Sequence, residues 1–346
     1  MSKVHTRKDI SNTTIELTIT VPADAYVKSY NTLLEKESKG VSMKGFRKGA
    51  VPTDVLESKI QDSLKLETFE RIAPLYVSQA VSIEQLELVA PPAYKEIPKI
   101  EKGKDIEFTI VCTVMPEFKL GSLKKIKLEK TKVEVEEKEM ESVMKELESR
   151  KTKAKAGTDE WVLEIAKNLY LEDVKTMKEL KEEIKERLLA QKEMNVRKEQ
   201  ENSALKQAIA LSKIEIPQPG IDYEALEREH SFLHTLEERK LTIEQFLNGN
   251  QIKIENMREM WKEDAKEALE TDVFLKLYAK ENDITVTDEE LENEVNKIKK
   301  EHEGHNHDYY DDPQWKEYVR RVLLKQKAYD AFVLAVLPVE KAKKSK

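Results

Sequence analysis

Two short stretches of this sequence gather side chains that could bind or react. Residues 40–52 read GVSMKGFRKGAVP and place Phe46 among three cations, whereas residues 301–312 read EHEGHNHDYYDD and are dense in imidazoles and carboxylates. Cations and an aromatic ring on a glycine-rich segment suit contacts with phosphates or with an acidic protein surface. Closely spaced imidazoles and carboxylates suit a divalent metal ion.

The histidine-rich stretch is the weaker of these two candidates. His302, His305 and His307 have no thiolate nearby, and the segment is typical of a polar connection between two helices. We therefore predict no cofactor and no physiological metal, with these histidines as weak candidates only. His230 and His234 stand one helical turn apart, but isolated pairs of this kind are usually structural or solvated.

The single cysteine does not predict catalysis. Cys112 lies in the alternating segment IEFTIVCTV with no histidine near it in sequence, so we expect a small buried strand residue rather than a nucleophile. One cysteine allows no intramolecular disulfide, which fits a reducing compartment. The sequence shows no secretory leader and no apolar run of about 18 residues, so we expect a soluble cytoplasmic protein with no membrane partner.

The cationic segment allows two interpretations of its aromatic residue. Phenylalanines usually belong to the core, so Phe46 could fold back as a hydrophobic staple between flanking helices. Against this, three glycines in ten residues keep the backbone open and leave a side chain there little to pack against. The residues alone leave both interpretations open.

Composition predicts the elements that must carry these segments. Of 346 residues, 39% are hydrophobic and 37% charged, with only 9 Gly and 11 Pro, which favours long solvated helices in two or three domains. Residues 1–115 are neutral by formal charge, so the whole net charge of −7 lies on residues 116–346. The positive charge is therefore local, which argues against an extended nucleic-acid-binding face.

A small α+β domain is predicted over residues 1–115. Residues 13–21 and 106–112 alternate apolar and polar side chains, as half-buried strands do. Pro22 favours a helix start and Gly40 its end. The predicted helices cover residues 24–37, 52–57 and 64–86.

The rest of the chain is predicted to be a linker and a helical domain. Residues 116–157 are expected to be extended, then helical from 136 to 150, and to end in the basic stretch KTKAKAGT. Within residues 158–346, the span from Thr176 to Ser212 has no Gly or Pro and predicts one helix of about 50 Å that projects rather than packs. Further helices are expected over 221–238, 254–281, 288–302 and from 313 onward, the third with a capping box of Thr287 and Glu290.

Here the string GFRKGAVP resembles the ribosome-docking signature of bacterial trigger factor, commonly written G-F-R-x-G-K-x-P. The resemblance continues in IEFTIVCTVMPEFKLGSLKKIKLEK and in SALKQAIALSKIEIPQPGIDYE, so it touches essentially the whole chain. It implies a mainly α fold with a small α+β N-terminal domain and an elongated, helical C-terminal body with projecting arms. It also implies a ribosome-associated, ATP-independent molecular chaperone.

The resemblance implies specific contacts. Its docking residues would meet the ribosome near the tunnel exit, through protein and rRNA, and the glycines would shape the turn. Ala50 stands where the family usually has a lysine, so we expect modest ribosome affinity. The implied docking set is Lys44, Gly45, Phe46, Arg47, Lys48 and Gly49.

The implied chaperone would shield apolar segments of nascent or unfolded polypeptides, and family members also self-associate off the ribosome. Methionine side chains adapt to varied partners, so exposed methionines are candidate client contacts. Met194 is the best of them, because it lies on the predicted 176–212 helix where apolar residues are sparse. Met177, Met257 and Met260 instead lie on regularly spaced apolar faces of their predicted helices, which favours core positions.

The family's FKBP-like prolyl isomerase module has no room in this sequence. Only ESRKTKAKAGT stands where the module would be inserted, and Gly157 is the single glycine between Gly121 and Gly220. We therefore predict that the chain is not an enzyme. Three alternatives stay open: a residual peptidyl-prolyl isomerase, a helical adaptor or assembly protein, and a periplasmic SurA-type chaperone, the last disfavoured by the absence of a leader.

Overall fold

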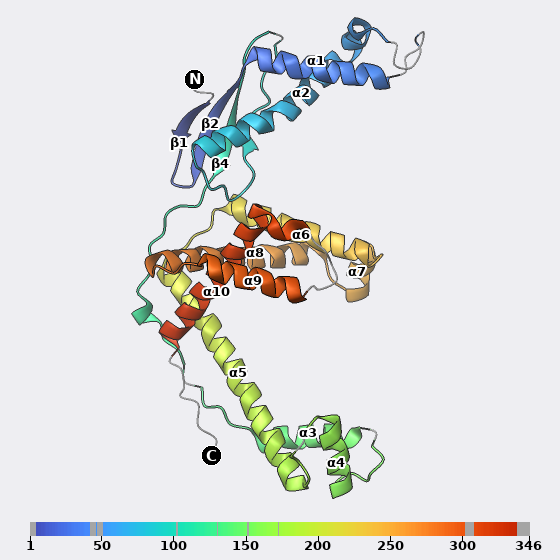
Figure 1. Ribbon diagram of the computed structural model, residues 1–346, viewed down its shortest axis with the longest axis vertical. Coiled ribbons are helices and arrows are strands. Elements are labelled where there is room, and N and C mark those ends of the chain that lie inside the picture. The colour runs from blue at the N-terminus through green and yellow to red at the C-terminus, as the bar shows by residue number, and fades with distance from the viewer. Residues whose placement is uncertain are drawn as a thin grey trace. The chain divides into compact units, whose positions relative to one another are not determined.

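The computed structural model describes residues 5–41, 46, 51–101, 103–129, 131–150, 152–171, 173–301 and 308–337. Ten α-helices, two 3-10 turns and four strands occur within these ranges (Figure 1). The expected fold class, mainly α with a small α+β N-terminal domain, is confirmed. Two compact units are present: unit 1 comprises Met1–Phe118 with Glu215–Glu270, and unit 2 comprises Lys119–Ile214 with Thr271–Lys346. The domain boundaries expected near 115 and 157 stay a prediction.

Unit 1 begins with an antiparallel sheet in the strand order β1-β2-β4-β3. Alternate residues of β2 and β4 are buried, with Leu17 opposite Ile110, so both strands expected from alternation are confirmed. The short edge strands were not predicted because the sequence of β1, HTRKD, buries only His5 and has no apolar alternation. The strands are β1 (His5–Asp9), β2 (Thr14–Val21), β3 (Ala93–Tyr94) and β4 (Ile106–Thr113).

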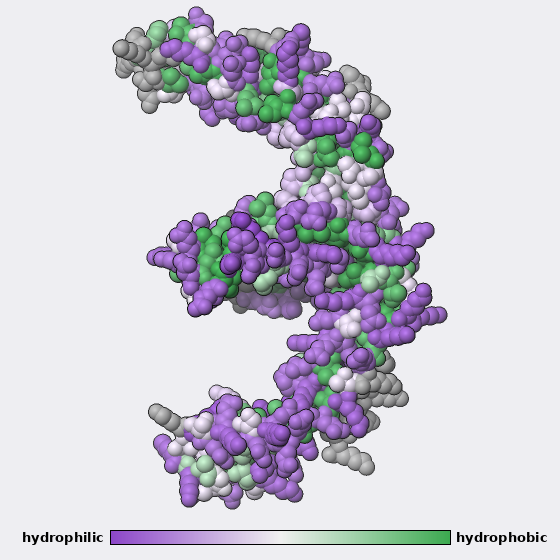
Figure 2. Space-filling model, turned by 180° about the vertical axis from the view of Figure 1, so that it is seen from behind, coloured by the Kyte–Doolittle hydropathy of each residue, from purple (hydrophilic) through white to green (hydrophobic). Residues whose placement is uncertain are grey.

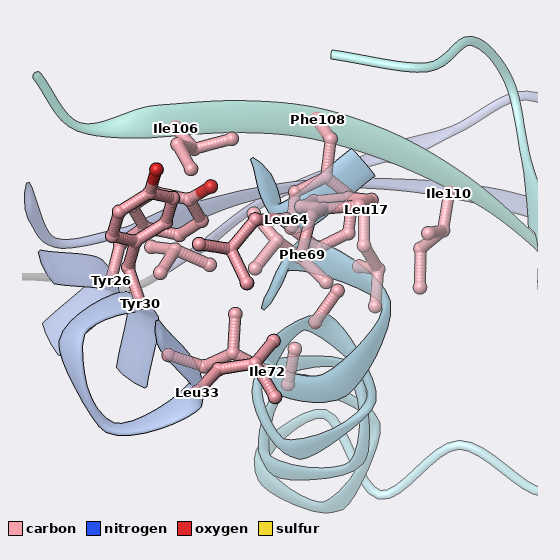
Figure 3. Close-up of a cluster of buried hydrophobic side chains, with 14 of the residues drawn as sticks. Leu17, Tyr26, Tyr30, Leu33, Leu64, Phe69, Ile72, Ile106, Phe108 and Ile110 are labelled. Carbon is pink, nitrogen blue, oxygen red and sulfur yellow. The ribbon is translucent and has the colours of Figure 1, made fainter. Parts of the chain in front are cut away.

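Helices α1 (Ala23–Gly40) and α2 (Thr53–Ile83) cover one face of this sheet and close its core (Figure 3). Phe69 of α2 lies edge-on to Phe108 of β4, with ring centroids 5.1 Å apart. The helix expected between Pro22 and Gly40 is confirmed. The two helical runs expected over 52–57 and 64–86 are wrong as separate elements, because half-buried Ile60 continues the apolar face between them.

The later part of unit 1 is a helical hairpin of α6 (Gln218–Glu238), the short α7 (Ile243–Asn250) and the first part of α8 (Ile254–Glu281). Two of these helices match the predicted spans. The sequence interpretation missed α7, which begins at a capping box of Thr242 and Gln245. Gly220 approaches Val89 closely, because a Cβ added to residue 220 would lie 3.2 Å from the Val89 side chain.

Unit 2 is organised around α5 (Met177–Leu211), a single helix of 35 residues, as predicted. The beginning of α5 packs with α3 (Glu137–Ser149) and α4 (Asp159–Asn168) around a core that includes Trp161 and Leu180. Near its other end, Ala204 and Ala208 are buried, whereas the middle of the helix has no buried residue. The thin apolar stripe expected over residues 191–201 is therefore confirmed.

The last helices of unit 2 also match their predicted spans. They are α9 (Asp288–Glu301) and α10 (Pro313–Val336), with a 3-10 turn at Asp308–Asp311 between them. The predicted capping box is confirmed, since the Thr287 N–H donates to Glu290 Oε2 at 2.8 Å and the Glu290 N–H donates to Thr287 Oγ1 at 3.2 Å. The extended linker expected over residues 119–135 is also observed in residues 119–129 and 131–135, interrupted by a 3-10 turn at Leu123–Lys125.

Candidate functional site

The segment that carries Phe46 connects α1 and α2 of unit 1. Both of its ends are anchored in the hydrophobic core, because Val51 is buried and Val41 packs against the same cluster. The Phe46 side chain is 39% exposed, so it is not a core residue. Of the expected docking residues, Lys44, Gly45, Arg47, Lys48 and Gly49 lie outside the described part of the chain, as does Ala50.

Two tyrosines of α1 fix the helices on which this segment stands. The Tyr30 hydroxyl donates to Glu57 Oε1 at 3.0 Å, and the Tyr26 hydroxyl donates to the Lys65 carbonyl at 2.9 Å. Burial raises the pKa of Tyr26 to about 12, so this hydroxyl remains a donor over the physiological pH range. These hydrogen bonds hold α1 and α2 together, and the two helices fix both ends of the segment that carries the exposed Phe46.

The helical hairpin of unit 1 presents a half-exposed aromatic cluster. Phe232 lies 5.0 Å from Phe246 and 5.5 Å from Trp261, measured between ring centroids, and none of the three is fully buried. Figure 2 shows hydrophobic surface near the α7 end of this hairpin. The sequence interpretation missed these residues, although aromatic side chains on short amphipathic helices were the signal that could have found them.

A forked ion pair holds the two long helices of the hairpin together. Arg258 of α8 donates from Nη2 to Glu229 Oε1 at 2.6 Å and from Nε to Glu229 Oε2 at 3.0 Å. The guanidinium group lowers the pKa of Glu229, so the pair is ionised at neutral pH. A charged clamp thus positions the helices while their aromatic residues stay accessible.

The methionine candidates lie in different settings. Met194 on α5 is 48% exposed, and Met260 on α8 is 61% exposed, so the core position expected for Met260 is wrong. Met257 is half-buried one turn before Trp261 on α8. Met177 packs against the core shared by α3, α4 and α5, as its stripe predicted.

A second surface with accessible apolar side chains, mixed with polar ones, lies at the end of α4 in unit 2. An open groove of about 630 Å³ is lined by Leu163, Leu171 and Val174 and by two lysines. Tyr170, which has a left-handed φ of 57° and is 91% exposed, also lines this groove. Accessible aromatic and aliphatic groups therefore occur in both units.

No candidate metal site emerges from the residues described. His302, His305 and His307 lie outside them, and the described ranges contain no group of three or more potential ligands. Asp312 caps α10 by accepting from the Gln314 N–H at 2.8 Å. His230 and His234 each lie beside a glutamate of α6, at 3.9 and 3.5 Å.

Cys112 is fully buried in β4, and burial raises the pKa of its thiol, in keeping with the structural role expected for it. Within the described ranges, no helix is both long enough and apolar enough to cross a bilayer.

Comparison with known proteins places these features in one family. The family model described as "Bacterial trigger factor protein (TF)" matches residues 2–147, and "Bacterial trigger factor protein (TF) C-terminus" matches residues 176–333. One solved structure, named "Promiscuous Substrate Recognition in Folding and Assembly Activities of the Trigger Factor Chaperone", is similar in fold. It has a TM-score of 0.54 and 18% identity, and the alignment covers 96% of this chain and 100% of that one.

Curated relatives agree with this result. The trigger factor of Halothermothrix orenii is 22% identical over 387 residues, which covers 86% of this chain and 90% of the relative. That of Haemophilus influenzae strain PittGG is 34% identical over 117 residues, or 34% of this chain and 27% of the relative. Fold and comparisons together define a helical chaperone with a small α+β domain. The chain belongs to the bacterial trigger factor family.

Proposed function

We propose that this chain is a ribosome-associated, ATP-independent chaperone that docks through residues 44–49 and shields apolar segments of emerging polypeptides. The observation that carries the proposal is the exposure of Phe46 on a segment anchored at both ends in the α1–α2 core. An aromatic anchor among three cations suits a surface of rRNA and ribosomal protein. The family membership of the chain supports the same assignment.

Client capture, in this proposal, uses the half-exposed cluster of Phe232, Phe246 and Trp261 together with Met194 and Met260. Contacts of this kind bury apolar area without requiring a particular client sequence. Because these side chains stand among many charged residues, each contact is weak. A client is released when its own folding buries the same groups more favourably.

The proposal includes no prolyl isomerase activity from an FKBP-like module. The matches to the two family models leave only residues 148–175 between them. The alignment with the Halothermothrix orenii relative runs over 387 residues, more than the 346 of this chain, so the relative has segments without a counterpart here. Within this span, the 10 residues of α4 pack against α5. We further propose a cytoplasmic location and self-association off the ribosome.

Co-sedimentation with ribosomes at two salt concentrations tests docking. The Phe46→Ala/Arg47→Ala/Lys48→Ala variant should pellet at least tenfold less than wild type, and its affinity should depend less on salt by about two charges. A matched control is Ile10→Ala/Lys8→Ala/Lys28→Ala, which removes the same charge and one exposed apolar side chain elsewhere in unit 1. Equal pelleting of the docking variant and wild type would overturn the proposal.

A further inference from the structure

A mostly extended segment of unit 2 lies along α5, and we call its described residues, 119–129 and 131–136, the strap. Its backbone is held by side chains of the helix at several levels. The Gly121 N–H donates to Ser212 Oγ just past the end of α5, and Gln200 Nε2 donates to the Glu129 carbonyl, both at 2.9 Å. Lys192 Nζ donates to the Glu134 carbonyl at 2.9 Å.

Gln207 makes the most specific of these contacts. Its Oε1 accepts from the Lys127 N–H at 2.9 Å, and its Nε2 donates to the Lys127 carbonyl at 2.9 Å. One glutamine side chain thus satisfies both backbone groups of one extended residue, as a neighbouring strand would. Because the bonds go to the backbone, this recognition does not depend on the side chain at position 127.

The strap is held without a buried side chain of its own. Every described residue from 119 to 136 is exposed or half-buried. The half-buried residues include Ile126, Leu128, Val133 and Val135, which alternate with exposed neighbours as in an extended chain. Because none of these side chains is fully buried, releasing the strap exposes only half-buried apolar groups and breaks a few hydrogen bonds, each with a net value of about 0.5–1.5 kcal/mol.

We propose that the face of α5 beneath the strap is a binding track for extended segments of unfolded polypeptide, and that the strap occupies this track as an internal competitor. The inference rests on the chaperone function proposed above. An unfolded client offers what the strap offers, namely unpaired backbone groups and alternating apolar side chains. Gln200 and Gln207 recognise the first without regard to sequence, which suits a promiscuous partner.

The competition has a measurable consequence. If the strap covers the track most of the time, apparent client affinity is lowered by the fraction of molecules in which the track is open. Weakening the strap from its own side should therefore tighten client binding. Weakening the track from the side of α5 should loosen it.

The strap-side variant is Gly121→Ala/Lys127→Pro. A Cβ at position 121 would lie only 2.4 Å from the carbonyl carbon of Leu211, so the backbone there must shift. Proline at position 127 removes the N–H group that donates a hydrogen bond to Gln207 Oε1. Both substitutions lie on the strap, so the sequence of α5 is unchanged. The matched control is Lys132→Pro, at an exposed strap residue whose N–H has no partner among the described contacts.

The track-side variant is Gln200→Met/Gln207→Met, which keeps side-chain bulk and removes the amide groups. Its control is Gln191→Met, an exposed glutamine of α5 whose Nε2 donates to Asn195 within the same helix. Reduced and carboxymethylated lactalbumin serves as the unfolded client, and binding is measured by fluorescence anisotropy.

We expect the strap-side variant to bind this client about tenfold more tightly than wild type, and the gain to vanish when the track-side changes are added. Both controls should bind like wild type. Wild-type affinity in the strap-side variant, or a gain that survives the track-side changes, would overturn the inference and leave the chaperone proposal standing. Absence of client binding by every protein, wild type included, would overturn both.

A tether gives a second test that does not depend on the stability of the strap-side variant. Lys127→Cys/Gln207→Cys, joined by a cleavable bifunctional thiol reagent, locks the strap on α5, while the native Cys112 is fully buried and protected from labelling. Client affinity should fall when the tether forms and recover when a reductant cleaves it. Unchanged affinity on cleavage would contradict the inference.

Discussion

The hydroxyl group of Tyr30 donates a hydrogen bond to the carboxylate of Glu57 at 3.0 Å, across the pair of helices that carries the proposed docking segment. Tyr30 is only 4% exposed, so the bond lies at the edge of the core rather than in solvent. It joins α1 to α2, and the ends of the segment between these helices are anchored in the same core through Val41 and Val51. The proposed docking segment and the core of this domain therefore depend on the same pair of helices.

Removing this hydroxyl should destabilise unit 1 without removing the docking residues. We expect Tyr30→Phe to lower the free energy of unfolding by about 1 kcal/mol, the usual net value of such a bond. Denaturant titration measures the change. Tyr223→Phe, at a tyrosine that is 38% exposed on α6, is the control and should be neutral. Equal stability of Tyr30→Phe and wild type would show that the bond contributes nothing.

The aromatic core between α2 and the sheet should be much more sensitive. Phe69 is 6% exposed and contacts both Phe108 and Tyr94, so Phe69→Ala should cost roughly 3 to 5 kcal/mol of unfolding free energy. Leu75→Ala, on the same helix but at a side chain 69% exposed, should change it by less than about 0.5 kcal/mol. Similar losses at the two positions would contradict the assigned core.

Client capture and ribosome docking should separate by mutation. Trp261→Ala removes the largest ring of the hairpin cluster, and we expect it to weaken binding of an unfolded polypeptide about three- to tenfold. Ribosome co-sedimentation should stay at the wild-type level, because the docking segment is unchanged. Tyr318→Ala, at an exposed aromatic residue of α10, serves as the control. A loss of ribosome binding in Trp261→Ala would count against separate surfaces.

Acid should weaken unit 2 through Asp272 on α8. Burial of this carboxyl opposes its ionisation, but the ammonium groups of Lys325 and Lys276 outweigh it, so the pKa of Asp272 lies below its ordinary value of 3.8. A carboxyl whose pKa is lower in the folded state stabilises the fold above the unfolded-state pKa. That stabilisation is lost as the pH falls through the folded-state pKa.

We therefore expect Asp272→Asn to lower the free energy of unfolding by about 1 to 2 kcal/mol at pH 7, with the difference from wild type shrinking below about pH 4. Urea titrations across pH 2.5–7 measure it. Asp264→Asn, at an exposed carboxylate of the same helix, is the control and should change the free energy of unfolding at pH 7 by less than about 0.5 kcal/mol. A constant difference at all pH values would exclude the electrostatic explanation.

Sequence patterns predicted the fold correctly where the spacing of apolar residues agrees with the side chains that are buried in the structure. The alternation of β2, the uninterrupted span of α5 and the Thr287–Glu290 capping box all follow from local residue choice. The agreement between the observed and the predicted spans of the C-terminal helices has the same origin. The spacing of apolar residues could not reveal β1, because its mostly charged sequence belongs to a strand at the edge of the sheet. The same spacing predicted two helices in place of the single helix α2, because the apolar face of α2 narrows between them.

The candidate surfaces were predicted less completely, for a physical reason. Exposure of Phe46 fits the glycine-rich segment, but the exposure of Met260 contradicts its regular stripe, because a stripe shows which residues share a face and not what covers that face. The contact between Gln207 and the Lys127 backbone joins residues 80 positions apart. Such side-chain-to-backbone recognition leaves no periodic signal in either segment.

The central claim is that the aromatic residue between α1 and α2 touches the ribosome, and site-specific photocrosslinking tests it most directly. A photoreactive phenylalanine analogue at position 46 should form crosslinks to ribosomal protein or rRNA, while the same analogue at Ile10, an exposed apolar position of the β1–β2 turn, should form few. Crosslinks of equal and low yield at the two positions would contradict ribosome docking through this segment.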